Sequence, residues 1–249
     1  MIEVKGLSKI FADGTEALKE VNVNINEGDF IAIIGLSGAG KSTFLRCLNR
    51  LIEPSQGEIW VSGQDITKLK GGALAKYRRS VGFIFQQFNL VHRLSVLDNV
   101  LTGRLGYQPS WRGLLGLYSP KDRDIAQNCI AQVGLQEKEL TRVDALSGGQ
   151  QQRVAIARAM TQEPKLILAD EPMASLDPRL SDVILGLLKD YNESKGVTVL
   201  VNIHVLELAK RYAKRLLAFN KGRLVFDGPI EALDEGLEQH IYSGNLDNL

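Results

Sequence analysis

Eight consecutive residues carry the glycine, lysine and hydroxyl spacing that binds nucleotide phosphates. The segment Gly35-Leu-Ser-Gly-Ala-Gly40-Lys41-Ser42 fits the pattern G-x-x-x-x-G-K-[ST] at every fixed position. Glycines let backbone N–H groups wrap anionic phosphates, and we expect Lys41 to neutralise the β and γ phosphates. The Ser42 hydroxyl is an oxygen ligand of the kind that Mg²⁺ prefers. The segment therefore predicts a nucleoside triphosphate site, without distinguishing a kinase, a GTPase or a motor.

A second candidate anion site lies at the start of a predicted helix. The stretch Leu146-Ser147-Gly-Gly-Gln150 places a serine at the N-cap of a helix that carries Val154 and Ile156 on its apolar face. An isolated S-G-G is more typical of a well-capped helix start than of a ligand site. Its functional meaning therefore depends on the motifs around it.

Two acids and a histidine follow predicted buried strands. Asp170 and Glu171 come directly after the apolar run Leu166–Ala169, and His204 comes after the run 197–203. Nearly continuous apolar runs are typical of central parallel strands, whose carboxyl ends meet at one edge of the sheet, where ligands bind. We therefore expect all three side chains beside the phosphate loop, where an acid pair next to bound Mg²⁺ has a chemical task.

The hydrophobic pattern predicts an α/β protein with three parts. The apolar run 30–34 is typical of a buried strand feeding the phosphate loop, which indicates a P-loop core with a mostly parallel central sheet. Alternation over 21–26 and 59–61 predicts strands with one wet face, and hence an antiparallel β subdomain. Residues 92–160 lack strong strand signals and predict an inserted helical lobe. We interpret 1–249 as a single domain.

Composition excludes several classes of protein. Thirty basic and twenty-nine acidic residues give a formal net charge of +1, so no global field is expected to hold nucleic acid. Cys47 and Cys129 have neither the spacing of a zinc site nor that of a disulfide framework. The start lacks a signal-peptide pattern, and no apolar run approaches the roughly 18 residues of a spanning helix. If the protein works at a membrane, we expect a partner to hold it there.

The order of these motifs resembles the ATP-binding subunits of ABC transporters over essentially the whole chain. Asp170 stands twenty residues beyond Gln150 and is followed by Ser175-Leu-Asp177 and then by His204. A P-loop kinase or switch GTPase would not need the 146–150 motif. A soluble ABC ATPase acting on DNA would normally carry a long coiled-coil or zinc insert, which is absent here. The resemblance implies an ABC ATPase fold, with ATP and Mg²⁺ as ligands.

Each matched side chain takes a role from that resemblance. Phe11 matches the aromatic that stacks on adenine, and Glu171 resembles the general base that orients water against the γ-phosphate. His204 resembles the histidine that contacts the γ-phosphate. The resemblance implies a catalytic set of Glu171, His204, Gln86 and Lys41. The positions matched to the phosphate loop are Gly35, Ser37, Gly38, Ala39, Gly40, Lys41, Ser42 and Thr43.

Three residues are implied as the Mg²⁺ ligands. Ser42 and Asp170 match the hydroxyl and carboxylate of the family, and Gln86 matches the glutamine that touches Mg²⁺ and the attacking water. That glutamine also senses the transporter's coupling helix. Gln87 could take its place by a slip of one residue, so the sequence favours Gln86 without settling the choice.

The expected partner subunits follow from where the γ-phosphate needs hydrogen-bond donors. Phosphoryl transfer needs donors on both sides of the γ-phosphate, and one chain offers only one side. In the family, Ser147 and Gly149 of a second subunit close over the nucleotide, which gives a head-to-tail pair with two sandwiched ATP molecules. Closure and release move integral membrane permease subunits, so we expect a peripheral position on the cytoplasmic face of the cell membrane. A periplasmic or surface substrate-binding protein is implied as an indirect partner.

The cargo is indicated by three short segments. Residues 102–115 resemble the lobe insert of phosphonate and phosphite importer ATPases, and residues 86–91 and 238–244 match the same group. Phosphonate is therefore the expected cargo, with an amino-acid or other small-solute importer as the alternative because such subunits share most of the remaining sequence.

The insert 102–119, which includes the segment 102–115, is expected to contact the membrane subunits. Arg104, Tyr107, Trp111 and Arg112 offer charged and aromatic side chains of the type that anchors interfaces.

Overall fold

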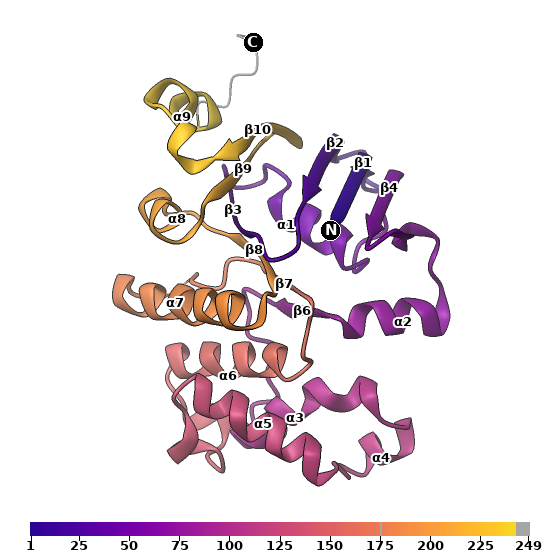
Figure 1. Cartoon of the computed structure of the whole chain (residues 1–249), viewed down its shortest axis with the longest axis vertical. Helices are drawn as coiled ribbons and strands as arrows, with labels where there is room; N and C mark the ends of the chain where they lie inside the picture. The colour runs from indigo at the N-terminus through magenta and orange to yellow at the C-terminus, as the bar shows by residue number, and fades with distance from the viewer. Residues whose placement is uncertain (175, 243–249) are drawn as a thin grey trace.

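The computed structural model describes residues 1–174 and 176–242 and contains two β-sheets (Figure 1). Ser175 and the last residues of the 238–244 segment lie outside the described residues. The larger sheet has six strands in the order β10-β9-β3-β8-β7-β6, all parallel except β10. Its strands are β3 (Phe30–Gly35), β6 (Val81–Ile84), β7 (Leu166–Ala169), β8 (Thr198–Asn202), β9 (Arg215–Asn220) and β10 (Arg223–Pro229).

The central parallel strands are buried on both faces, as their apolar runs predict. Every residue of β3, β6, β7 and β8 is buried. Side chains alternate between faces, so Ala32 and Ile34 join one apolar core while Ile31 and Ile33 join the other. The strands expected at 30–34 and Leu166–Ala169 are confirmed, and the strand expected at 197–203 is one residue shorter at each end.

The smaller sheet is antiparallel, with strand order β2-β1-β4-β5. Its strands are β1 (Ile2–Ile10), β2 (Glu16–Ile25), β4 (Gln56–Val61) and β5 (Gln64–Asp65). Val21, Val23 and Ile25 of β2 are buried, whereas Asn22 and Asn24 are exposed. This confirms the one-sided strand that the alternation predicts. The buried face packs with α1 (Lys41–Leu48) and α2 (Gly71–Arg79) in the second core.

Helices α7 (Pro178–Lys195) and α8 (Leu206–Tyr212) contribute to the core on the other face of the large sheet. The Asp177 carboxylate accepts the backbone N–H groups of Arg179 and Leu180 and so caps α7. Gly196, with φ of 65°, ends it in the left-handed conformation that glycine adopts at least cost. Helix α9 (Glu235–Tyr242) follows β10 and a 3₁₀ turn at Ile230–Ala232.

The segment between β6 and β7 is helical and forms the lower part of Figure 1. It contains α3 (Val96–Leu101), η2 (Thr102–Tyr107), α4 (Ser110–Leu114), α5 (Pro120–Gln132), η3 (Gln136–Lys138), η4 (Val143–Ala145) and α6 (Gly148–Met160). Apolar residues of α3, α5 and α6 belong to the same core as α7 and one face of the sheet. Among the described residues, no helix combines the length and apolarity needed to cross a membrane. The predicted α/β class is confirmed.

Candidate functional site

The phosphate loop connects β3 to α1 and requires glycine at both of its ends. Gly35 has φ of 139°, and a Cβ there would lie 2.1 Å from the carbonyl oxygen of Phe219. Gly40 has φ of 104°, and a Cβ there would lie 2.4 Å from the carbonyl oxygen of Ala17. Any side chain at either position would collide with backbone of a neighbouring segment. The glycine spacing is thus imposed by local packing as well as by ligand access.

Lys41 is the buried cation of this loop. Its Nζ donates hydrogen bonds to two backbone carbonyl oxygens of the loop, at 2.8 Å to Gly35 and at 2.9 Å to Leu36. Burial lowers the pKa of the Lys41 ammonium, while Glu171 and Asp170 oppose that shift through their charges. The loop therefore holds a desolvated positive charge that is already compensated by backbone carbonyls.

Asp170 connects the loop to the end of β7. Its Oδ1 accepts a hydrogen bond from Ser42 Oγ at 2.6 Å and one from Asn202 Nδ2 at 3.2 Å. Its Oδ2 accepts from Arg46 Nη2 at 3.0 Å. The Asp170 side chain is 2% exposed, so these donors compensate for the cost of burying its charge. The predicted proximity of Asp170 to the phosphate loop is confirmed.

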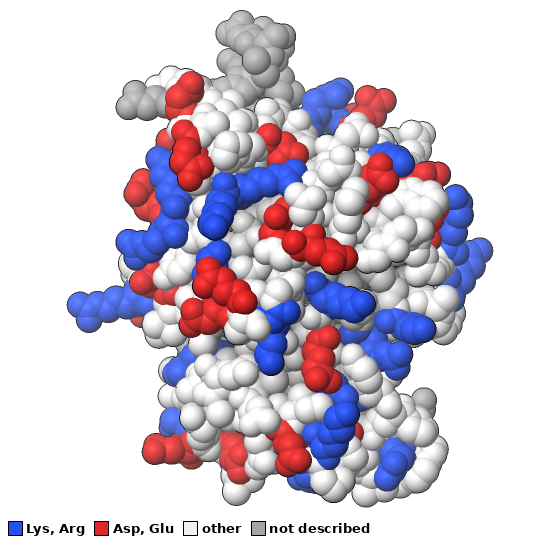
Figure 2. Space-filling view, viewed as in Figure 1, with Lys and Arg blue, Asp and Glu red and all other residues white. Residues whose placement is uncertain are grey.

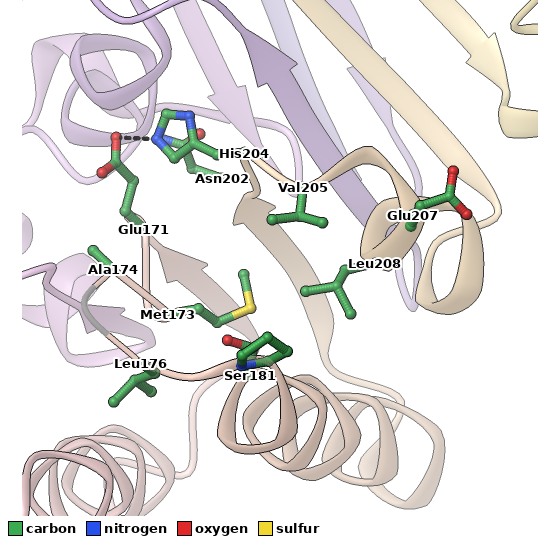
Figure 3. Close-up of a pocket in the computed structure, with 11 residues that line it drawn as sticks. Glu171, Met173, Ala174, Leu176, Ser181, Asn202, His204, Val205, Glu207 and Leu208 are labelled. Atoms are coloured by element: carbon green, nitrogen blue, oxygen red, sulfur yellow. Dashed lines mark ion pairs between the residues drawn. The ribbon is translucent and has the colours of Figure 1, made fainter.

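Glu171 and His204 face each other at the rim of a cavity (Figure 3). His204 Nε2 lies 2.7 Å from Glu171 Oε1, and the two side chains are 45% and 20% exposed. Glu171 has φ of 52°, a left-handed conformation that is uncommon for a residue other than glycine. Such backbone strain persists where the surroundings fix it, and it is found at functional sites.

The cavity beside this pair has a volume of about 370 Å³ and a mainly apolar wall. Figure 3 shows Met173, Val205 and Leu208 converging on it from the segment after β7 and from the start of α8. Glu171 and His204 line it as well. An apolar wall excludes water from one side of the pair, so their mutual attraction is stronger than it would be in bulk solvent.

The donor set around Asp170 fits a hard divalent cation. Ser42 and Asp170 offer a hydroxyl and a carboxylate, and the amide oxygen of Asn202 is buried without a hydrogen-bond partner among the described residues. Oxygen donors of this kind suit Mg²⁺, which keeps several waters that can satisfy such an acceptor. Within the described parts of the chain, no group of three or more Cys, His, Asp or Glu residues could hold a metal. The oxygen donors of Ser42, Asp170 and Asn202 are what fit such a cation here.

Other predicted ligand residues are accessible. Gln86 and Gln87 both follow β6 and are both exposed, so burial does not choose between them. Phe11 is 36% exposed in the turn between β1 and β2, where Lys9 Nζ lies 5.2 Å from its ring centroid. Ser37, in the loop, is exposed as well.

Ser147 occupies the N-cap of α6, as predicted. Its hydroxyl accepts from the backbone N–H of Gln150, whose side chain accepts in return from the Ser147 N–H. Gly149 packs so closely that a Cβ would lie 2.8 Å from the side chain of Leu180. Helix α6 packs on the opposite face of the sheet from α1 (Figure 1). This cap therefore belongs to a different surface from the phosphate loop of its own chain.

The structure corrects one expectation about the 102–119 insert. Arg104 is 6% exposed rather than available to a partner. Its Nε bonds Asp122 at 2.8 Å and its Nη1 bonds Glu163 at 2.9 Å, with the ring of Tyr107 3.9 Å from the guanidinium carbon. Arg104 therefore fastens the insert to α5 and to the end of α6. By contrast, Trp111 is 60% exposed.

Two contacts of Asp170 escape sequence reasoning. Arg46 lies four residues after Ser42 on α1, a spacing that places both side chains on one helix face. Asn202 ends β8 as Asp170 follows β7, and the two strands are neighbours in the sheet. Both signals exist in the sequence, although neither residue is part of a motif.

The charged residues on the face shown in Figure 2 are of both signs and are interspersed. This agrees with the near-balance of acidic and basic residues in the sequence.

Comparisons with known proteins point to one family. A family model described as ABC transporter matches residues 18–174. The phosphonates import ATP-binding protein PhnC of Lactobacillus johnsonii is 50% identical over 244 residues, which cover 98% of this chain and 96% of that protein. The protein of the same name from Staphylococcus epidermidis is 49% identical over 245 residues, with 98% and 95% covered.

Solved structures show the same fold. The ATP-binding cassette MJ0796, in a dimeric post-hydrolysis state bound to ADP and Pi, matches with a TM-score of 0.82 and 36% identity. That match covers 94% of this chain and 100% of the other. A second dimeric structure of MJ0796, described as a bacterial ABC transporter cassette, matches with a TM-score of 0.83 and 37% identity, with the same coverage.

Proposed function

Because the chain belongs to the ABC transporter family of ATP-binding proteins, we propose that it hydrolyses ATP to drive the import of phosphonates. The observation that supports ATP hydrolysis is the Ser42–Asp170 hydrogen bond of 2.6 Å, which joins the phosphate loop to the acid pair. The proposed phosphonate cargo rests on relatives of that name at about half identity over nearly the whole chain.

In this proposal the nucleotide phosphates occupy the loop 35–43. Lys41 exchanges its hydrogen bonds to two backbone carbonyls for hydrogen bonds to the β and γ phosphates. Its buried positive charge then stabilises the negative charge that develops on the transferred phosphoryl group. Glu171 accepts the proton of the attacking water as general base. His204, 2.7 Å from that carboxylate, orients it and contacts the γ-phosphate. Phe11 stacks on the adenine.

Ser42 and Asp170 are proposed to hold Mg²⁺, together with Gln86 after β6. The metal supplies charge neutralisation for the β and γ phosphate oxygens when it is bound. Gln87 is the alternative to Gln86. Replacing each glutamine by alanine separately and measuring the Mg²⁺ requirement of hydrolysis decides between the two.

The proposed partners follow from the position of Ser147 and Gly149 on the far face of the sheet from α1. We infer that these residues close over the nucleotide of a second copy of the chain, so that two ATP molecules are sandwiched in a head-to-tail dimer. The dimer in turn drives integral permease subunits, which hold it at the cytoplasmic face of the membrane. A substrate-binding protein delivers the cargo to those subunits.

Growth and uptake test the cargo directly. We expect a strain lacking this chain to fail on methylphosphonate as sole phosphorus source and to grow normally on inorganic phosphate. Re-expression of the parent chain should restore growth and uptake of radiolabelled methylphosphonate, whereas the Glu171→Gln variant should not. Normal growth on methylphosphonate together with lost uptake of an amino acid would overturn the cargo and leave the ATPase standing.

A further inference from the structure

The two oxygens of the Asp170 carboxylate have different partners. Oδ1 receives the Ser42 hydroxyl at 2.6 Å and the Asn202 amide at 3.2 Å. Oδ2 receives Arg46 Nη2 at 3.0 Å. Among the described residues, Arg46 is the one cation that pairs with this carboxylate, because Lys41 donates to loop carbonyls instead. Arg46 therefore supplies the counter-charge that a buried carboxylate needs.

We propose that Arg46 is a positioning residue that acts as an internal counter-cation for Asp170 and competes with Mg²⁺ for that carboxylate. The inference rests on the proposed function, in which Ser42 and Asp170 hold the metal. In the protein without nucleotide, Arg46 keeps Asp170 compensated. In the complex with nucleotide and metal, the Arg46 guanidinium would no longer bond the Asp170 carboxylate.

The geometry allows this exchange without rebuilding the site. Arg46 is 42% exposed, whereas Asp170 is 2% exposed, so the guanidinium can move into solvent while the carboxylate stays in place. Of the Arg46 side-chain donors, only Nη2 has a hydrogen-bond partner among the described residues. Asn202 is fully buried and continues to hold Oδ1 after Arg46 has left. The exchange thus breaks one bond and leaves the orientation of Asp170 fixed.

Competition has a thermodynamic signature that a purely structural contact lacks. Removing the guanidinium leaves a buried charge uncompensated in the metal-free protein, which lowers its stability. The same removal leaves the carboxylate free for the metal, so metal affinity rises. For a partly exposed pair we expect a gain of about three- to tenfold. Loss of a structural contact alone would destabilise both states and leave affinity unchanged or weaker.

The test uses Mn²⁺ as a spectroscopic substitute for Mg²⁺ on the full chain saturated with ADP. Electron paramagnetic resonance of free Mn²⁺ gives its dissociation constant, and thermal unfolding in EDTA gives the stability of the metal-free protein. We expect Arg46→Met to bind Mn²⁺ about three- to tenfold more tightly and to unfold at a lower temperature in EDTA. Arg46→Gln, which keeps a donor without charge, should show the same gain, whereas Arg46→Lys should bind Mn²⁺ as the parent does.

Arg211→Met is the matched control, because it removes an exposed arginine that pairs with Asp182 at 2.6 Å. It should change neither measurement. Unchanged or weaker Mn²⁺ binding in both neutral Arg46 variants would overturn the proposed competition. If the parent ADP complex itself fails to bind Mn²⁺, the metal site at Ser42 and Asp170 is wrong, and this inference falls with it.

Discussion

Replacing Lys41 by methionine tests the phosphate loop most selectively, because methionine keeps most of the apolar stem and removes the charge. Lys41 is 4% exposed in the parent, and its ammonium must exchange hydrogen bonds to two carbonyl oxygens for hydrogen bonds to phosphate. The contribution of Lys41 to the free energy of nucleotide binding is therefore a difference between two kinds of hydrogen bond, those to phosphate and those to backbone carbonyls. That difference is about 2 kcal/mol, which is much less than a full buried Coulomb energy. That difference corresponds to about a thirtyfold loss of nucleotide affinity.

The effect should be confined to binding. Burial already disfavours the charged Lys41, as its lowered pKa indicates, so the variant without nucleotide should be as stable as the parent or slightly more stable. Fluorescent ATP titrated into the monomer measures affinity, and urea unfolding without nucleotide measures stability. Lys210→Met, an exposed lysine on α8, is the control and should match the parent. Parent-like ATP affinity in Lys41→Met would refute the assignment of this loop.

Three further predictions follow from residues outside the loop. Ser147→Arg should abolish ATP turnover, because the cap at Ser147 acts on the nucleotide of the partner subunit. Nucleotide affinity of the free monomer, measured by titration, should stay within about twofold of the parent, and equal losses of turnover and affinity would contradict this. Arg104→Met should lower the free energy of unfolding in urea by about 2 kcal/mol, since it leaves the partly buried Asp122 without its cation, and a loss below about 0.5 kcal/mol would show that the pair is not structural. Native protein at pH 8 should not react with Ellman's reagent, because burial raises the pKa of the Cys47 thiol to about 12 and also raises that of Cys129. Rapid reaction of either thiol in the native protein would contradict this burial.

The parts of the fold that follow one periodicity were predictable from sequence. The alternation of Val21, Val23 and Ile25 was sufficient for the wet-faced strand β2, and the continuous run Leu166–Ala169 for a strand covered on both sides. Each pattern depends on whether one face or both faces of the strand are covered by other elements. Strands β1, β5, β6, β9 and β10 were not identified from the sequence. For β10 the pattern gives no signal, because its residues are half-buried or exposed with no clear two-residue period.

Site residues were predictable where a motif fixes them and not where tertiary contacts do. Asp170 follows from its place after a buried strand. Arg46 and Asn202 were missed because their importance arises from one carboxylate that three distant segments share. Arg104 was misplaced for a related reason. An arginine in a polar, aromatic insert suggests an exposed contact, and only the fold brings Asp122 and Glu163 to it.

Chemistry at Glu171 is the central claim, and one variant tests it most directly. Glu171→Gln keeps the shape of the side chain and removes the base, so it should bind ATP like the parent and hydrolyse it at least about a hundredfold more slowly in single turnover. With hydrolysis blocked, ATP-dependent dimers should accumulate and be visible by size-exclusion chromatography with light scattering. Hydrolysis at the parent rate in single turnover, or a variant that stays monomeric with ATP, would contradict the account.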